Sequence, residues 1–192
     1  MYVRDAKNRD EVWLLDQIEA AAIDDPAFRS RDYVIALDEE TGQKVGFGRI
    51  RVHADGPEDH CELAFVYTLE EWRDHGVGAH IIERLIAEAG DAGYERVYTF
   101  TEQPEYFSSF GFDPLAKPAL PAGLRERFGE VQAQRDAAAP MAIAVDGFKM
   151  PPSARRAFKQ VDAVADDAVE VKETPEDFGY DPETTTHKYD VR

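Results

Sequence analysis

The chain has 192 residues, of which 43% are hydrophobic, so it is large enough for one domain with an ordinary core. Its net charge of −17 argues against nucleic acid as a partner, because phosphate backbones are bound by basic surfaces. No apolar run approaches the roughly 18 residues of a membrane span, and residues 1–12 lack an apolar signal region. We therefore expect a cytoplasmic protein that binds no membrane.

Acidic residues occur along the whole chain, with 39 Asp and Glu against 22 Lys and Arg. Such a composition resembles cytoplasmic proteins of salt-loving microbes, which stay soluble through carboxylate hydration and net repulsion. An acidic surface that attracts cationic substrates is the alternative. At molar salt, however, the screening length falls to about 3 Å, which favours halophilic adaptation over recognition. Cys61 is the single cysteine, so we expect a small buried side chain and no disulfide or cysteine zinc site within the chain.

The first third of the chain predicts one strand, one helix and a hairpin. Apolar residues at helical spacing follow Asp10, which is a suitable N-cap. A connection containing Gly42 then joins two β-rich runs, at a position where positive φ is commonly needed. The predicted elements are a strand at residues 2–4, a helix at 11–22, and strands at 33–37 and 44–53.

Residues 62–89 combine a strand, a turn and a helix, and the rest of the chain is organised around them. β-Branched and aromatic residues dominate residues 61–69, which predicts a strand. After the turn, apolar residues recur at helical spacing and predict an amphipathic helix. Its apolar residues are Val77, Ile81, Ile82, Leu85, Ile86 and Ala89.

The remaining elements complete a mixed sheet. Gly90 and Gly93 are suitable C-cap residues for the long helix. A strand–helix–strand crossover within one sheet is right-handed, so helices are expected on both faces. The predicted elements are a strand at residues 96–101, a short helix at Pro104, a strand at Phe112, a polar helix at 122–135 and a strand at 141–145.

Beyond Met150 the chain changes character, with few large apolar residues and many acids up to residue 192. Residues 153–161 predict a short helix. Residues 169–172 or 187–191 are candidates for an added edge strand. A largely solvated tail is the alternative for this acidic C-terminal extension, residues 150–192.

Between the central strand and helix, Arg73, Gly76 and Gly78 form an R-x-x-G-x-G sequence. Glycine lets the backbone approach a ligand closely, and the unpaired N–H groups of a helix start bind phosphate oxygens. The pattern therefore predicts a pyrophosphate cradle. It is neither a dinucleotide fingerprint, which needs three glycines, nor a Walker loop, which needs Gly-Lys-Ser/Thr. A simple tight connection is the alternative.

This stretch resembles the acetyl-CoA-binding segment of the GNAT superfamily of N-acetyltransferases, in which Gln or Arg and two small residues follow the fourth strand. A second motif lies in register, since residues 104–112, PEYFSSFGF, resemble the family's short helix and "GF" turn. The resemblance covers roughly residues 1–145. It implies a GNAT-like domain over residues 1–149, an α+β or α/β fold with a mixed, mostly antiparallel central sheet of six to seven strands flanked by helices on both faces.

The resemblance also implies how acetyl-CoA, as acetyl donor, is held without a metal. The strand edge would pair with the pantetheine arm, and a backbone N–H there would polarise the thioester carbonyl. Backbone N–H groups of the turn and helix start would hold the pyrophosphate. The implied coenzyme-binding residues are Val66, Tyr67, Thr68, Arg73, Asp74, His75, Gly76, Val77, Gly78 and Ala79.

Glu62 is the candidate general base, because it lies eleven residues before Arg73, as the catalytic glutamate does in the histone-acetyltransferase-like branch of the family. Strand alternation predicts that it shares a face with Ala64, Val66 and Thr68. Burial would raise its pKa into the useful range for a base. The alternative is a structural salt bridge with Arg49 or Arg51 on the neighbouring strand.

Tyr106 is the candidate general acid. The family resemblance would place a tyrosine four residues before the glycine of the GF turn, and that position holds Phe107. Either the short helix is rotated so that Tyr106 takes the role, or the thiolate leaves unassisted. The latter is chemically reasonable, because a free thiol has a pKa of only about 8.5.

The leading hypothesis is an N-acetyltransferase that acts on a primary amine of a small metabolite or amino acid, by direct attack in a ternary complex. Soft signals such as Thr101 and the Leu120-Pro121 pair resemble the amino-acid acetyltransferase branch. A protein lysine or N-terminal acetyltransferase is one alternative. A catalytically silent acyl-CoA-binding regulatory module is another. We expect a monomer or homodimer.

Overall fold

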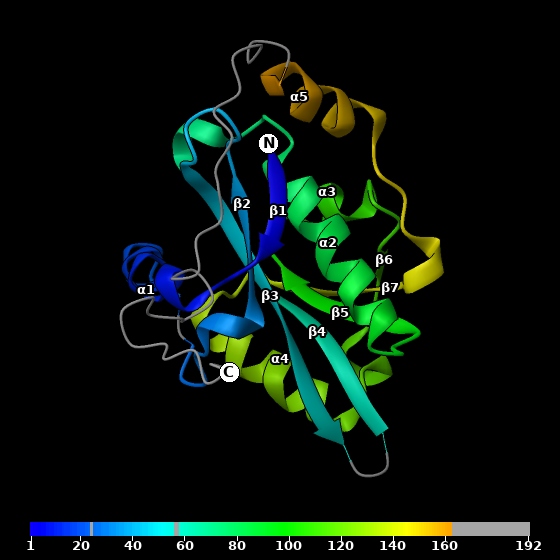
Figure 1. Cartoon of the computed structure of the whole chain (residues 1–192). Coiled ribbons are helices and arrows are strands. Elements are labelled where there is room, and N and C mark those ends of the chain that lie inside the picture. Colours follow the sequence, from blue (N-terminus) through cyan, green and yellow to red (C-terminus); the bar gives the residue numbers. More distant parts are fainter. Residues whose placement is uncertain (24, 56–57, 163–192) are drawn as a thin grey trace, which may run out of the picture.

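One mixed sheet organises the described part of the chain, residues 1–23, 25–55 and 58–162, in a computed structural model (Figure 1). Within these residues seven strands pair in the order β1-β2-β3-β4-β5-β7-β6, and every neighbouring pair is antiparallel except β4 and β5. The strands are β1 Tyr2–Asp5, β2 Tyr33–Leu37, β3 Lys44–Asp55, β4 Glu58–Thr68, β5 Arg96–Thr101, β6 Asp113–Pro114 and β7 Ala139–Ala144.

Helices cover both faces of this sheet, as the sequence predicts. On one face α2 buries its apolar side against β2, β3 and β4, and α3 adds Phe107 to the same core. On the other face α1 and α4 each cover a separate apolar cluster. The helices are α1 Glu11–Ala20, α2 Val77–Asp91, α3 Pro104–Ser108, α4 Ala122–Gln134 and α5 Pro152–Asp162.

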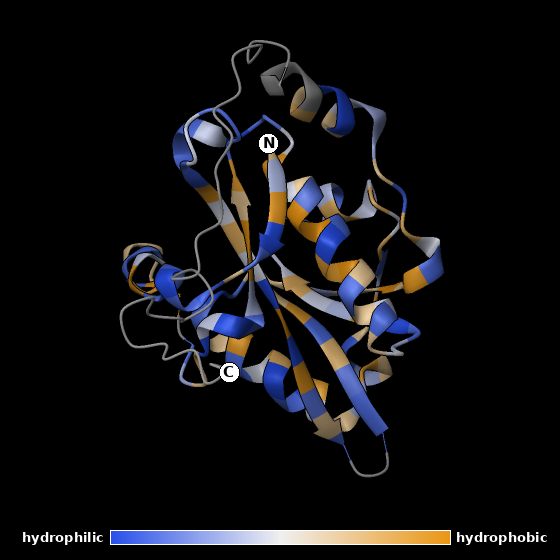
Figure 2. Ribbon diagram, in the orientation of Figure 1, coloured by the Kyte–Doolittle hydropathy of each residue, from blue (hydrophilic) through white to orange (hydrophobic). Residues whose placement is uncertain are grey.

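Helix α2 lies against β3 at very short range. Its apolar residues are fully or almost fully buried, and Figure 2 shows them alternating with hydrophilic residues along the helix. Gly48 of β3 makes this contact possible, because a Cβ there would lie 2.6 Å from Ile81 Cγ2 and 2.7 Å from the Phe65 carbonyl oxygen. A side chain at position 48 would therefore push α2 away from the sheet.

Most element boundaries agree with the sequence to within two or three residues. The strand β3 and its partner β4 are longer than predicted, because β4 begins at Glu58 and β3 reaches Asp55. The predicted helix beyond residue 150 is confirmed as α5, and its Phe158 ring stacks on His80 of α2 at 3.7 Å. The candidate edge strands at 169–172 and 187–191 lie outside the described residues. Among the residues that are described, no helix has both the length and the apolar character of a membrane span.

Asp10 stands at the N-cap position of α1, but its side chain makes no capping hydrogen bond there, so the predicted capping role is wrong. The fully buried carboxylate instead accepts hydrogen bonds from Arg4 and from the Lys7 amide, and Lys44 Nζ lies 2.8 Å away. Burial alone would raise the pKa of the Asp10 carboxyl. The hydrogen bonds from Arg4, Lys44 and the Lys7 amide outweigh it and hold that pKa well below its usual range.

Asp10→Asn is expected to lower the free energy of unfolding by about 2 kcal/mol or more at pH 7, since two cations lose their buried partner. A depressed folded-state pKa gives stability that is present above the unfolded pKa of about 3.9 and is lost as the pH falls through lower values. The difference between variant and wild type should therefore shrink below about pH 4. Urea unfolding at a series of pH values measures this, with Asp16→Asn on the exposed side of α1 as the control. A difference that does not change with pH would contradict the assignment.

Candidate active site

Strands β4 and β5 run parallel but pair at two positions only, the second being Glu62 opposite Tyr98. Just beyond, the Thr99 hydroxyl donates a hydrogen bond of 3.0 Å to the Leu63 carbonyl oxygen. The strands then diverge, because the pairing of β4 with β3 shifts register at this point and β4 carries a bulge. The divergence opens a pocket of about 270 Å³ and leaves backbone groups of β4 without an opposing strand.

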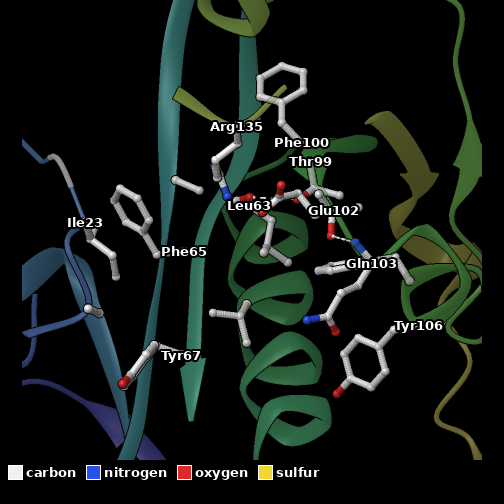
Figure 3. Close-up of a pocket in the computed structure, with 15 residues that line it drawn as sticks. Ile23, Leu63, Phe65, Tyr67, Thr99, Phe100, Glu102, Gln103, Tyr106 and Arg135 are labelled. Carbon is white, nitrogen blue, oxygen red and sulfur yellow. Dashed lines mark hydrogen bonds between the residues drawn. The ribbon is translucent and has the colours of Figure 1, made fainter. Parts of the chain in front are cut away.

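Figure 3 shows that this pocket has two walls. Phe65 and Tyr67 of β4 form one wall, and Gln103 and Tyr106, which follow the end of β5, stand on the other. Arg135, at the end of α4, points in between them. The pocket therefore combines aromatic walls, one guanidinium and an open strand edge.

The bulge also changes which face each β4 residue occupies, so the predicted alternation is wrong. Leu63 is paired with Ile50 and Phe65 with Arg49, which leaves Ala64 as the extra residue. Beyond it, Val66 packs into the α2 core, as Leu63 does before it. Glu62 is thereby separated from Val66 and faces the α4 side of the sheet.

The glycine-rich turn opens directly into α2. Asp74 and Gly76 both have positive φ, 64° and 76°, and no side chain caps the helix start. In the first backbone hydrogen bond of the helix, the His80 N–H donates to the Gly76 carbonyl oxygen at 3.2 Å. The N–H groups of the preceding residues, Val77, Gly78 and Ala79, therefore have no intrahelical acceptor, and the positive end of the helix dipole adds to them. This is the local arrangement that binds an anionic group.

A second pocket, of about 460 Å³, lies at this helix start and shares Val66, Tyr67, Gln103 and Tyr106 with the first. The two pockets therefore form one crevice that runs from the helix start to the gap between β4 and β5. Residues lining only the second pocket are Thr68, Trp72, Arg73, Asp74, Val77 and Gly78.

The predicted coenzyme-binding residues therefore lie together along the crevice, except for three whose side-chain positions point elsewhere. The His75 side chain is exposed, and its Nδ1 lies 2.8 Å from the Arg73 carbonyl oxygen. The Ala79 side chain is buried in the α2 core. A Cβ at Gly76 would point at α5 and meet the Ala154 carbonyl oxygen, whereas one at Gly78 would point into the crevice.

Tyr106 faces the crevice, and its neighbour Phe107 is buried in the α2 core. The Tyr106 hydroxyl comes within 3.1 Å of the position that a Cβ on Gly78 would occupy. Although 40% of the residue is exposed, burial of the phenol and the nearby charge of Asp74 raise its pKa to about 12. The phenol is therefore protonated at every physiological pH and can donate a hydrogen bond into the crevice.

Glu62 is 2% exposed and lines neither pocket of the crevice. His53 Nε2 donates to its carboxylate at 2.6 Å, and Arg127 Nε lies 3.6 Å from the same oxygen. The partners expected for a structural role, Arg49 and Arg51, instead bind Asp25, so that expectation is wrong. The register does pair Arg51 with Glu62, but the Arg51 guanidinium turns to Asp25, and His53, which is paired two residues along with His60, contacts Glu62 instead.

Sequence reasoning missed Gln103, Glu102 and Arg135 as crevice residues. The first two follow directly after β5, and the C-terminal end of a strand beside a divergence is a recurrent place for binding residues. The sequence therefore contained a signal for Glu102 and Gln103. It contained no signal for Arg135, because only the packing of α4 brings that residue to the crevice. In the described part of the chain, no group of three or more His, Cys, Asp or Glu side chains is placed to hold a metal ion.

The fold and the crevice together define a mixed α/β protein with an open strand edge beside an uncapped helix start. The family model for the acetyltransferase (GNAT) family matches residues 2–112, more than half of the chain, and the protein belongs to this family. No curated protein matches the chain.

Solved structures share the fold at low identity. N-acetylglutamate synthase from Neisseria gonorrhoeae, complexed with coenzyme A and N-acetyl-glutamate, is 18% identical with a TM-score of 0.58; the match covers 74% of this chain and 34% of that one. Rv2747 from Mycobacterium tuberculosis, in complex with CoA and NLQ, is 18% identical with a TM-score of 0.63, covering 75% and 99%. Ribosomal-protein-alanine N-acetyltransferase from Brucella melitensis is 19% identical with a TM-score of 0.51, covering 75% and 99%.

Gly78→Glu is expected to abolish acetyl-CoA binding while the protein stays folded, because its side chain and charge would enter the crevice at the helix start. Gly76→Glu should instead destabilise the fold, since it forces a non-glycine residue to φ 76° and against α5. Calorimetric titration and thermal unfolding separate the two effects. Gly129→Glu on α4, where a Cβ meets nothing within 4 Å, is the matched control. Unchanged affinity in Gly78→Glu would remove the cradle assignment.

Proposed function

We propose that this protein transfers an acetyl group from acetyl-CoA to a primary amine of a small metabolite or amino acid. The observation that carries the proposal is the single crevice joining an uncapped glycine-rich helix start to the gap between β4 and β5. A linear molecule with an anionic end and a reactive thioester end fits such a crevice. We propose residues 1–149 as the acetyltransferase domain, with residues 150–192 as an acidic extension.

In this proposal the backbone N–H groups of residues 77–79 and the Arg73 side chain hold the pyrophosphate. The open edge of β4 at Val66, Tyr67 and Thr68 supplies backbone groups for an extended arm. Acetyl-CoA, when bound, supplies an activated acyl group with a thiolate leaving group. The residues of the protein must then orient the amine, remove its proton and stabilise the leaving sulfur.

The acceptor end of the crevice supports an amine that also carries a carboxylate. Glu102 and Arg135 both line it, so an ammonium and a carboxylate on one small molecule each meet an opposite charge. Neisseria N-acetylglutamate synthase, whose structure holds N-acetyl-glutamate, shares this fold. This chain spans only about a third of that enzyme, so the acceptor is proposed from the residues of the crevice.

A protein acceptor is the second candidate, because the Brucella ribosomal-protein-alanine N-acetyltransferase is matched over 99% of its length. The crevice favours a small acceptor, since Phe65, Phe100 and Ile23 enclose its inner end. A silent binding module was suggested by the phenylalanine at position 107. Tyr106 weakens that reading, because its hydroxyl reaches the crevice from the adjacent position.

We propose Tyr106 as a hydrogen-bond donor to the leaving sulfur. Full proton transfer is disfavoured, because the phenol pKa of about 12 lies well above the roughly 8.5 of a thiol. A hydrogen bond to a charged group contributes about 1.5 to 3 kcal/mol. Loss of the hydroxyl should therefore cost on the order of 10- to 100-fold in rate.

We propose Glu62 as the general base, acting indirectly on the amine, because the carboxylate lines neither pocket of the crevice. Two features support it. The carboxylate is almost fully buried, and it has an imidazole partner, His53, at 2.6 Å. The competing role is structural, as the buried partner of His53 and Arg127.

An assay of free thiol release across a panel of amines tests the function. Acidic and neutral amino acids are expected to turn over, while peptides with a free N-terminus react at least about tenfold more slowly. Turnover on peptides alone would favour a protein acceptor, and binding without turnover would indicate a silent module.

We also propose that the acidic surface reflects adaptation to high salt. Activity and thermal stability should then rise between roughly 0.1 and 3 M potassium chloride, as carboxylate repulsion is screened.

Glu62→Gln and Tyr106→Phe are expected to differ in their pH profiles. If Glu62 removes the amine proton, Glu62→Gln loses about 10²- to 10⁴-fold at pH 7 and recovers at high pH, where free amine already exists. Tyr106→Phe should lose activity evenly from about pH 6 to pH 10, because a phenol with a pKa of about 12 stays protonated throughout. Steady-state rates at several pH values test both. A pH-independent loss in Glu62→Gln, with reduced thermal stability, would make Glu62 structural.

A further inference from the structure

Five arginines gather around a second opening, of about 720 Å³, that shares no lining residue with the crevice. It lies where β2 begins, beside β3 and the C-terminal half of α2. We call this opening the arginine pocket. Its lining residues include Arg29, Arg31, Arg49, Arg51 and Arg84, with Asp5, Asp32 and Glu88.

Three of these arginines are engaged within the protein. The buried carboxylate of Asp25 accepts hydrogen bonds from both Arg49 and Arg51. Arg84 Nη2 lies 2.7 Å from Asp5, and Arg84 Nε lies 3.2 Å from Glu88. Arg49 Nη2 also lies 3.3 Å from Asp32, so carboxylates match these three arginines and the excess positive charge of the pocket comes from Arg29 and Arg31.

The other two arginines have no anionic partner among the described residues. The Arg29 side chain makes no hydrogen bond or ion pair with them, and Arg31 donates only to the neutral Asn8 amide oxygen, at 3.2 Å. Both side chains are exposed at the rim. Burial raises the pKa of Glu88 to about 7, so this carboxyl contributes less negative charge to the pocket at neutral pH. A cationic concavity on a chain of net charge −17 attracts small anions.

The floor of the pocket is apolar. The pairing of β2 with β3 ends at Tyr33 opposite Arg49, so Ile50 and Val52 extend beyond β2. Val52 is 48% exposed, so its side chain offers apolar surface to a ligand in the pocket. Guanidinium forks over an apolar floor suit a molecule that has a carboxylate and an apolar body.

We propose that the arginine pocket is a second ligand site, which binds a small organic carboxylate with an apolar body at a place separate from the crevice. The site is linked to the crevice through Phe65, which lines the acceptor end: the Arg51 guanidinium lies 5.5 Å from the Phe65 ring, and Arg49 pairs with Phe65 across the strands. Occupancy therefore changes the apparent affinity for the amine. The binding itself does not depend on the proposed acetyl transfer.

The test is calorimetric titration at about 0.1 M salt, where screening is modest. The probe is 3-phenylpropionate, its amide is the neutral analogue, and inorganic phosphate is the anion without an apolar body. Saturable binding of 3-phenylpropionate is expected, with the amide and phosphate each at least about tenfold weaker. The double variant Arg29→Gln, Arg31→Gln should lose about tenfold or more in affinity. Arg96→Gln, another exposed arginine, is the matched control.

The Gly78→Glu variant should bind the probe as wild type does, which separates this site from coenzyme binding. No saturation up to about 10 mM, or wild-type affinity in the double variant, would overturn the proposal. Equal affinity for phosphate would overturn the carboxylate assignment. With an active amine, the probe should shift the amine KM at least twofold or so and leave the acetyl-CoA affinity unchanged. An unchanged KM would remove the link through Arg51 and Phe65.

Discussion

The divergence of β4 from β5 is the feature on which the candidate site depends. Parallel pairing stops after Glu62 and Tyr98, and the bulge at Ala64 turns the remainder of β4 away. Helix α2 holds that geometry from one side, because Gly48 lets it pack directly on β3. The same helix begins at the end of β4, so its free N–H groups and the open strand edge face one crevice. A site for an extended anionic molecule thus results from one local irregularity and one close helix contact.

The net charge of the protein does not show where its cations are paired with buried carboxylates. Acidic residues dominate the composition, and several cations are paired with buried carboxylates. Arg4 and Lys44 neutralise the buried Asp10, which ties β1 to the start of β3. Arg49 and Arg51 share the buried Asp25 beneath the arginine pocket. Because a buried charge is costly without a partner, these pairings constrain the fold more than exposed carboxylates do.

In α3 the aromatic side chain that faces the crevice is that of Tyr106, one position before Phe107. Phe107 fills the core against Phe110 and Phe112, and Tyr106 reaches the crevice instead. Its ring packs edge-on against Phe110, which fixes the direction of the phenol. The hydroxyl therefore meets the helix start at Gly78 although the residue one position later is buried.

The elements, their order and the helix start at Gly76 and Gly78 could be predicted from the sequence, because hydrophobic period and glycine position act locally. The sequence also raised Tyr106 as one of two possibilities for the leaving thiolate, and the structure places its hydroxyl at the crevice. The sequence did not determine the partner of Glu62, since Arg51, which is paired opposite Glu62, binds Asp25 from a distant segment and leaves the carboxylate to His53. Nor did it determine which face Val66 occupies, because that depends on the bulge in β4. Arg135 and the arginine pocket likewise required the tertiary structure. Their residues come from segments far apart in the chain, and only the packing of α2 and α4 on the sheet brings them together.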